Sequence, residues 1–387
     1  MAEPDRTTDQ APIPATVGRR ARMRRRHPER NALLAVLVGL LLISAAVVVL
    51  SRTVVDRYTA TVPVADLFGD GSSASAPPGK LTGPVNVLLV GIDRPADQPE
   101  RTPRADTVLV VHIPAELSRA YLISLPRDLL VEIPAFGVSG HPGGVDRINA
   151  AMAYGSRVPG AGKPDPVAGF QLLAATVSAR TGIEQFDAGV IVNFAGLERL
   201  VDAIGGVRMH IDSDVRSRHR QPDGRLRPSN PDGPGYAGPQ AEYRQGEHRL
   251  SGWQALDYVR QRESLPDGDY GRQRHQRQLV RALAEQVLTR DLITDPTRLG
   301  AVLEATGDAV VVGTRGRSVL DFALGLRRLR ADGIVLLDLP GTAVADPVGE
   351  YLGERFTDDA DDCFGALRAG TLDQFVLTRP ELVNRER

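Results

Sequence analysis

The strongest constraint on this chain is an uncharged apolar run near its N-terminus. Residues 31–50 are twenty residues without a charge, rich in Leu, Val and Ala. This length is enough for one helix to cross the hydrocarbon core of a bilayer. Seven arginines between Arg19 and Arg30 directly precede the run, and such charge stays on the cytoplasmic side. We therefore predict a cytoplasmic basic tail at 1–30, a single transmembrane helix at 31–50, and an extracytoplasmic location for everything after Ser51.

Two other interpretations of this region are open. A cleaved signal peptide would normally have a shorter apolar core, and no clear small-x-small cleavage site follows Leu50, so an uncleaved anchor is favoured. The arginine run would suit nucleic acid, but it lacks interleaved aromatic residues and a helix-turn-helix pattern. The net charge of −1 offers no general attraction to polyanions. We expect no nucleic-acid partner.

The remaining sequence predicts a tether followed by one folded domain. Residues 51–84 are expected to be a flexible linker, because 69–83 are rich in Gly, Ser, Ala and Pro. Three apolar, β-branched runs, at 85–92, 107–113 and 120–125, then suit strands buried on both faces. The predicted strands are 85–92, 107–113, 120–125, 188–193, 207–211 and 334–339, and the predicted helices are 148–154, 166–180, 194–204, 296–305 and 318–330. This mixture predicts one α/β domain over 85–387, with a central sheet between helical layers.

Several stretches carry narrower expectations. Residues 212–247 are polar, rich in Pro and Gly, and aperiodic, which predicts a long loop that is either functional or disordered. Cys363 is the only cysteine, so no intrachain disulfide can form, and no Cys/His cluster suggests a structural zinc. The acidic run 358–362 is expected to be a solvated face, with calcium binding as the alternative. A helix–strand pair is expected to close the chain.

One arginine-rich stretch concentrates groups that suggest chemistry. Arg260 and Arg262 are two residues apart, so an extended or helix-terminal backbone would point both to one side. Asp269, Arg272 and Gln276 follow at intervals of three and four and would share one face of a helix. Arginine forks and a carboxylate that could hold a cation are what a pyrophosphate needs. A solvated, Arg-rich helix end is the alternative.

Other charged residues stand at the ends of predicted strands. They are Asp93 and Arg94 after the first strand, Arg104 and Asp106 at the opening of the second, and Arg127 after the third. Ligand groups gather at strand ends in open α/β sheets. If the three strands are neighbours, Asp93, Asp106 and Arg127 will lie close together. Surface salt bridges or turn-capping aspartates are the alternative.

Six blocks of sequence lie in one order between residues 85 and 290. They are VNVLLVGIDR, RADTVLVVHI, LISLPRDLLVEIP, DRINAAMAYG, VNFAGLERLVDAIGGV and LSGWQALDYVRQRES…DYGRQRHQRQ. In this order, after an apolar anchor, they resemble the LytR–CpsA–Psr family. The resemblance implies a three-layer α/β/α domain with a central mixed β-sheet. It also implies an extracytoplasmic phosphotransferase that moves a glycopolymer, such as teichoic acid or arabinogalactan, from a polyprenyl-pyrophosphate carrier to a peptidoglycan hydroxyl. A magnesium ion would assist, with Mn²⁺ as the alternative.

The resemblance also implies roles for the residues that match the family's motifs. The catalytic set would be Asp93, Asp106, Arg127 and Asp269, with Asp106 and Asp269 holding the metal. The pyrophosphate would be bound by Arg94, Arg104, Arg127, Arg260, Arg262, Arg272 and Gln276. Asp93 would either orient arginines or accept the proton of the attacking hydroxyl. His275 stands where many members have Arg, which puts one phosphate contact in question.

Two rival functions use the same residues. With water as acceptor, the site would make the protein a polyprenyl-pyrophosphate phosphatase. Without turnover, the arginine cage would make it a receptor for anionic wall or lipid ligands. Trp253, the only tryptophan, and His112, within a predicted strand, are expected to have structural roles.

Overall fold

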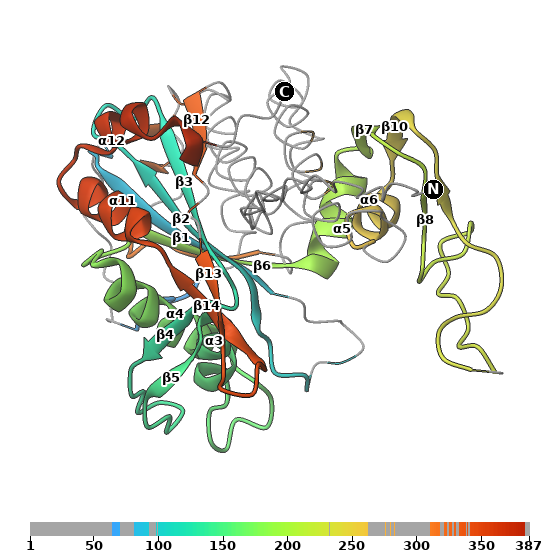
Figure 1. Ribbon diagram of the computed structural model, residues 1–387, viewed down its shortest axis with the longest axis horizontal. Coiled ribbons are helices and arrows are strands. Elements are labelled where there is room, and N and C mark those ends of the chain that lie inside the picture. The colour runs from blue at the N-terminus through green and yellow to red at the C-terminus, as the bar shows by residue number, and fades with distance from the viewer. Residues whose placement is uncertain are drawn as a thin grey trace, which may run out of the picture.

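The centre of the protein is a six-stranded mixed sheet with the strand order β11-β6-β1-β2-β3-β12 (Figure 1). The computed structural model describes residues 64–69, 81–92, 98, 100–231, 233–261, 275, 279, 282, 310–317, 321–322, 325–326, 329, 333–337, 339 and 341–383. Within these residues no helix is both long and apolar enough to cross a bilayer. The predicted span 31–50 lies outside them.

The strands of the sheet run in both directions. They are β1 (Val85–Ile92), β2 (Ala105–Ile113), β3 (Ala120–Leu125), β6 (Ala188–Asn193), β11 (Val310–Gly313) and β12 (Ile334–Leu337). β2 pairs antiparallel with both β1 and β3, and β11 pairs antiparallel with β6. β6 runs parallel to β1 and β12 parallel to β3. The mixed α/β architecture expected from the sequence is confirmed.

Both faces of the sheet are buried, as the near-continuous apolar runs predicted. Along β1, Leu88 and Val90 belong to one core cluster, whereas Val87 and Leu89 belong to the other. This alternation follows from the two-residue period of a strand. Helices α3 (Ile148–Ser156), α4 (Pro166–Thr181) and α11 (Asp358–Arg368) supply residues to the first cluster, and Phe322, Leu326 and Leu329 cover the opposite face.

Helix α4 shows how local sequence fixes the limits of an element. The side chain of Asp165 caps its first turn by accepting from Val167 N at 2.8 Å, and Pro166 occupies the first helical position. Gly182 ends the helix in the left-handed conformation, with φ of 68°. These signals explain why the predicted and observed helices nearly coincide.

Two hairpins and the end of the chain differ from the predictions. The unpredicted hairpins are β4 (Leu130–Ile133) with β5 (Gly144–Arg147), and β13 (Gly341–Ala345) with β14 (Tyr351–Phe356). The predicted closing helix–strand pair is wrong, because α11 is followed by another helix, α12 (Leu372–Thr378), and a 3₁₀ turn. A short apolar run does not distinguish strand from helix by periodicity. The acidic run forms the first turn of α11, where negative charge favours the helix dipole.

A smaller unit with its own core lies beside the sheet (Figure 1). It comprises α5 (Phe194–Ala203), β7 (Val207–Ile211), β8 (Val215–Arg216), β9 (Glu242–Tyr243), β10 (Gly246–Leu250) and α6 (Gly252–Tyr258). β7 pairs with β10, and β8 pairs with β9. The prediction that 212–247 is entirely loop is therefore wrong. Strands of two residues are too short to show a period in the sequence.

Residues 64–69 pack against the domain although they lie within the predicted tether. Ala65 N donates to Val312 O on the outermost strand, β11, at 2.9 Å, and Leu67 is fully buried. The Phe68 ring meets Phe170 edge-on, with centroids 5.7 Å apart. The packed part of the chain thus extends to the N-terminal side of Val85.

Candidate active site

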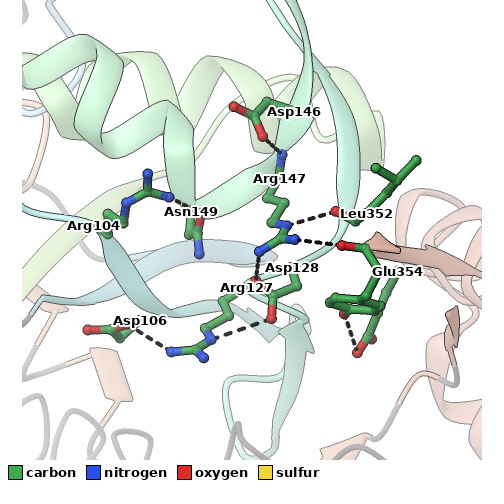
Figure 2. Close-up of polar contacts among 10 residues, drawn as sticks. Arg104, Asp106, Arg127, Asp128, Asp146, Arg147, Asn149, Leu352 and Glu354 are labelled. Atoms are coloured by element: carbon green, nitrogen blue, oxygen red, sulfur yellow. Dashed lines mark hydrogen bonds and ion pairs between the residues drawn. The ribbon is translucent and has the colours of Figure 1, made fainter. Parts of the chain in front are cut away.

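The first cluster of predicted site residues forms where β2 begins and β3 ends. These two strands are antiparallel neighbours, so the start of β2 and the end of β3 lie side by side. We call this end of the strands the edge of the sheet. Asp106, on β2, accepts a hydrogen bond at its Oδ1 from Nη1 of Arg127, two residues beyond β3, at 3.2 Å (Figure 2). The expected proximity of Asp106 and Arg127 is thus observed.

Arg127 is the first member of a line of alternating charges. Its Nε lies 3.6 Å from Oδ2 of Asp128, and Oδ1 of Asp128 lies 3.6 Å from Nη1 of Arg147. Arg147 in turn donates from Nε to Leu352 O at 2.8 Å and from Nη2 to Tyr351 O at 3.2 Å. The side chains of Asp106 and Arg127 are 31% and 37% exposed. Solvent, and therefore a ligand, can reach both groups.

Asn149, at the start of α3, connects the two arginines of this edge. Its backbone N donates to Arg127 O at 3.1 Å, and its side-chain Oδ1 accepts from Arg104 Nη1 at 3.2 Å. Asn149 itself is buried, whereas Arg104 is exposed. A buried amide thus holds the exposed Arg104 guanidinium against α3 (Figure 2).

Asp146 fixes the segment that carries Arg147 and Asn149. Its Oδ1 accepts from Arg147 N at 2.6 Å, and its Oδ2 accepts from the hydroxyl of Tyr154. The hydrogen bond to the Asp146 carboxylate, together with burial, raises the pKa of Tyr154. The tyrosine therefore stays protonated and keeps donating.

The β13–β14 hairpin closes one side of the cluster. Glu354 N donates to Asp128 O at 2.8 Å. A Cβ on Gly353 would come within 2.6 Å of the same oxygen, so only glycine allows the hairpin to approach this closely. Burial and the nearby Glu354 carboxylate raise the pKa of Tyr351, and its ring lies beneath the Arg147 guanidinium at 5.3 Å.

Four residues of this cluster have no role predicted from the sequence. They are Asp128, Asp146, Arg147 and Asn149, and all four hold the arginines in place. A signal was present, since the block DRINAAMAYG places three polar residues around the start of an apolar helix. The partners of Asn149 and Arg147, however, include Arg104 and the β13–β14 hairpin, which lie far along the chain, and no local pattern identifies such contacts.

The second group of predicted residues is described only in part. Arg260 lies in the turn after α6, and its backbone N donates to Asp257 O at 3.1 Å. His275 is fully buried. Its Nε2 lies 3.1 Å from Asp212 Oδ1, and its ring stacks on Tyr258 with centroids 4.1 Å apart. His275 thus belongs to the protein interior instead of replacing a phosphate-binding arginine. Asp93, Arg94, Arg262, Asp269, Arg272 and Gln276 lie outside the described residues, and their roles stay predictions.

Similarity to known proteins covers most of the chain. The profile of the LytR_cpsA_psr family matches residues 56–361. The cell wall biosynthesis protein LcpA of Corynebacterium glutamicum is 29% identical over 294 residues, which cover 70% of this chain and 52% of that protein. The polyisoprenyl-teichoic acid–peptidoglycan teichoic acid transferase TagU of Enterococcus faecalis is 30% identical over 212 residues, 55% of this chain and 56% of that protein. The chain spans about half the length of the curated relatives it matches.

Two solved structures share the fold at low sequence identity. The crystal structure of Bacillus subtilis TagV has a TM-score of 0.52 and 21% identity, and the match covers 76% of this chain and 98% of that one. Protein gbs0355 of Streptococcus agalactiae has a TM-score of 0.53 and 22% identity, over 75% of this chain and 88% of that one.

Proposed function

Because the chain belongs to the LytR–CpsA–Psr family, we propose that it transfers a cell-wall glycopolymer from a polyprenyl-pyrophosphate carrier to a hydroxyl of peptidoglycan. The observation that carries this proposal is the partly exposed Asp106–Arg127 ion pair, near which Asn149 bonds both the backbone of Arg127 and the side chain of Arg104. Guanidinium groups and an accessible carboxylate suit a pyrophosphate and its accompanying cation.

In the proposed reaction the acceptor hydroxyl attacks the phosphorus on the sugar side of the pyrophosphate. A new oxygen–phosphorus bond forms, the bond to the bridging oxygen breaks, and polyprenyl monophosphate leaves with that electron pair. The product is a phosphodiester between glycopolymer and peptidoglycan. Asp93 is our candidate to accept the hydroxyl proton. Transfer of this kind depends on positioning and charge neutralisation more than on a covalent intermediate.

The arginines would neutralise charge on the phosphates. Arg104 and Arg127 donate from one edge of the sheet, and Asn149 and Asp128 keep them oriented. We assign the remaining phosphate contacts to Arg94, Arg260, Arg262, Arg272 and Gln276.

We further propose that Asp106 and Asp269 hold Mg²⁺, with Mn²⁺ as the alternative. No group of three or more His, Cys, Asp or Glu suitable for an ion occurs among the residues that the structure describes. The two carboxylates of Asp106 and Asp269 still fit magnesium, which commonly uses one or two carboxylates and takes its other ligands from substrate phosphates and water. The cation would offset the negative charge of the pyrophosphate. The run 31–50 would anchor the protein, with the catalytic domain on the extracytoplasmic side.

The test uses the full-length protein in detergent with a synthetic polyprenyl-pyrophosphoryl oligosaccharide and Mg²⁺. Release of polyprenyl monophosphate is followed with and without a peptidoglycan acceptor. We expect release that requires the acceptor and joins sugar phosphate to the glycan. Release without acceptor would instead make the protein a phosphatase, and binding without release would make it a receptor.

Substitution of Asp106 tests the assignment of the metal. We expect Asp106→Ala to abolish release, with Asp361→Ala as the matched control, because Asp361 is a solvent-exposed aspartate of α11. Wild-type turnover by Asp106→Ala would contradict the assignment.

A further inference from the structure

A pocket of about 190 Å³ opens between α6 and the segment 217–241 of the smaller unit. The segment contributes His219, Arg220 and Leu226 to its lining, and α6 with the turn after it contributes Trp253, Leu256, Asp257 and Arg260. An indole, two leucines, two guanidiniums, an imidazole and a carboxylate therefore meet in one small space. Of these residues, only Arg260 has a role in the proposed function.

The pocket is pre-formed, because a buried carboxylate joins its two walls. Asp257 is 6% exposed. Its Oδ1 accepts from Ser217 Oγ at 3.0 Å and from Gln261 Nε2 at 2.9 Å, and its Oδ2 accepts from the Tyr243 hydroxyl at 2.7 Å. The donors come from the segment, from β9 and from the turn after α6, so one side chain connects all three.

The segment wall is fixed by further hydrogen bonds. Ser217 Oγ also accepts from the backbone N of His219 at 3.1 Å and of Arg220 at 2.8 Å. Arg220 Nη1 donates to Gly224 O at 2.7 Å, and Gly224 lies against the indole of Trp253, where an added Cβ would be 3.0 Å from the ring. The pocket therefore needs little reorganisation to receive a ligand.

The chemistry of the lining suits a sugar ring. A pyranose has an apolar C–H face and a rim of hydroxyls, which matches an indole and a leucine beside several hydrogen-bonding groups. Burial lowers the pKa of His219; the Asp257 carboxylate opposes this shift, and the neighbouring arginine charges reinforce it. A neutral imidazole has one donor and one acceptor nitrogen, so it can donate a hydrogen bond to a sugar hydroxyl or accept one from it. A bare inorganic anion would use the arginines but leave Trp253 and Leu226 without a role.

We propose that this pocket binds a sugar, namely the one bonded to the donor's pyrophosphate. The position of Arg260 indicates which sugar of the donor would occupy the pocket. It lines the pocket and is also one of the arginines assigned above to the pyrophosphate, so the occupant lies next to that group. The inference rests on the proposed function for the identity of the donor.

The experiment compares two probes in equilibrium binding to the full-length protein. One is bare polyprenyl pyrophosphate and the other is polyprenyl-pyrophosphoryl N-acetylglucosamine. We expect Arg220→Ala to weaken binding of the sugar-bearing probe about tenfold, the equivalent of about 1.4 kcal/mol, and to leave the bare probe within about twofold. Arg225→Ala is the matched control, since Arg225 lies in the same segment, is 83% exposed and does not line the pocket. It should change neither affinity.

A second variant guards against misfolding at Arg220. Leu226 lines the pocket while being 66% exposed, so Leu226→Ala should leave the fold intact and weaken only the sugar-bearing probe. The thermal midpoints of the three variants should match that of the wild type.

The outcomes separate this inference from the proposed function. Equal weakening of both probes by Arg220→Ala, or identical behaviour of the Arg220 and Arg225 variants, would overturn the sugar site. Equal affinity of the wild type for the two probes would do so as well. A sugar preference that depends on Arg220 in a protein that releases no polyprenyl monophosphate would instead keep the sugar site and reject the transferase.

Discussion

Two carboxylates in this protein are held in opposite ways. Asp106, at the edge of the main sheet, is 31% exposed and pairs with the charged Arg127. Asp257, in the smaller unit, is 6% exposed and accepts hydrogen bonds from Ser217, Tyr243 and Gln261. Half-exposed ion pairs contribute little to stability, whereas breaking a buried polar network leaves its donors without partners. The first arrangement therefore suits a ligand site, and the second suits a structural joint.

The largest expected effect separates activity from stability at the sheet edge. Arg127→Ala should lower turnover about 10²–10³-fold, because a preorganised donor to the reacting phosphate is lost. The free energy of unfolding should change by less than about 1 kcal/mol. Rates of polyprenyl monophosphate release and denaturant midpoints, measured on the same preparations, check both values. Intact turnover and intact donor binding together would show that the phosphate site is misplaced.

At the other carboxylate the effect should fall on stability. Asp257→Ala leaves the hydroxyls of Ser217 and Tyr243 without this acceptor, whereas Gln261 Nε2 keeps its bond to the backbone O of residue 257. We expect a loss of roughly 3 kcal/mol in the free energy of unfolding. Asp106→Ala should lose under about 1 kcal/mol. Tyr243→Phe, which removes one donor and leaves the others bonded, is the intermediate control. If the Asp106 and Asp257 variants unfold at the same denaturant concentration, the distinction between the two carboxylates fails.

The sequence predicts these two regions unequally well, and the reason is physical. β1, β3, β6 and β7 coincide with the predicted runs, because an apolar strand buried on both faces leaves a continuous local signal. The pairing of β2 with β3, and with it the Asp106–Arg127 contact, follows because consecutive strands tend to be neighbours. Local signals of this kind were enough to locate the edge of the sheet.

Contacts between distant segments left no such signal. Arg147 reaches Leu352 O across 205 residues of sequence, and the polar residues involved also occur on any solvated surface. The segment 212–247 reads as a loop because its order depends on Asp257, which lies 40 residues beyond Ser217. Sequence periodicity reports burial on one element, whereas these features depend on the partner that the fold supplies.

A buried histidine within the sheet, His112, should make the stability of the protein depend on pH. His112 is 3% exposed on β2 and bonds Asn86 Oδ1 through Nδ1 at 2.8 Å, in line with its expected structural role. Burial lowers the pKa of His112 from 6.5 to about 4. The unfolded chain then binds more protons than the folded one between these two values, so stability falls as the pH falls through this window.

From pH 7 to pH 5 the loss due to His112 should be roughly 2 kcal/mol. Denaturant midpoints at the two pH values, for the wild type and for His112→Gln, isolate this contribution, because glutamine keeps a donor for Asn86 and does not titrate. An unchanged pH dependence in the variant would contradict the assignment to His112.

The smallest expected effect tests how firmly the segment 217–241 is joined to α6. Gly224 and Gly238 have nearly the same positive φ, 84° and 81°, but only at Gly224 would a Cβ meet the Trp253 indole, at 3.0 Å. At Gly238 the nearest atom, on Pro228, is 4.0 Å away. Both alanine variants should lose about 1 kcal/mol to backbone strain, and Gly224→Ala should lose up to about 1 kcal/mol more because the indole must shift. Equal denaturant midpoints for the two variants would mean that the segment moves away from Trp253 at no cost, and a pocket built against that indole would then not be preorganised.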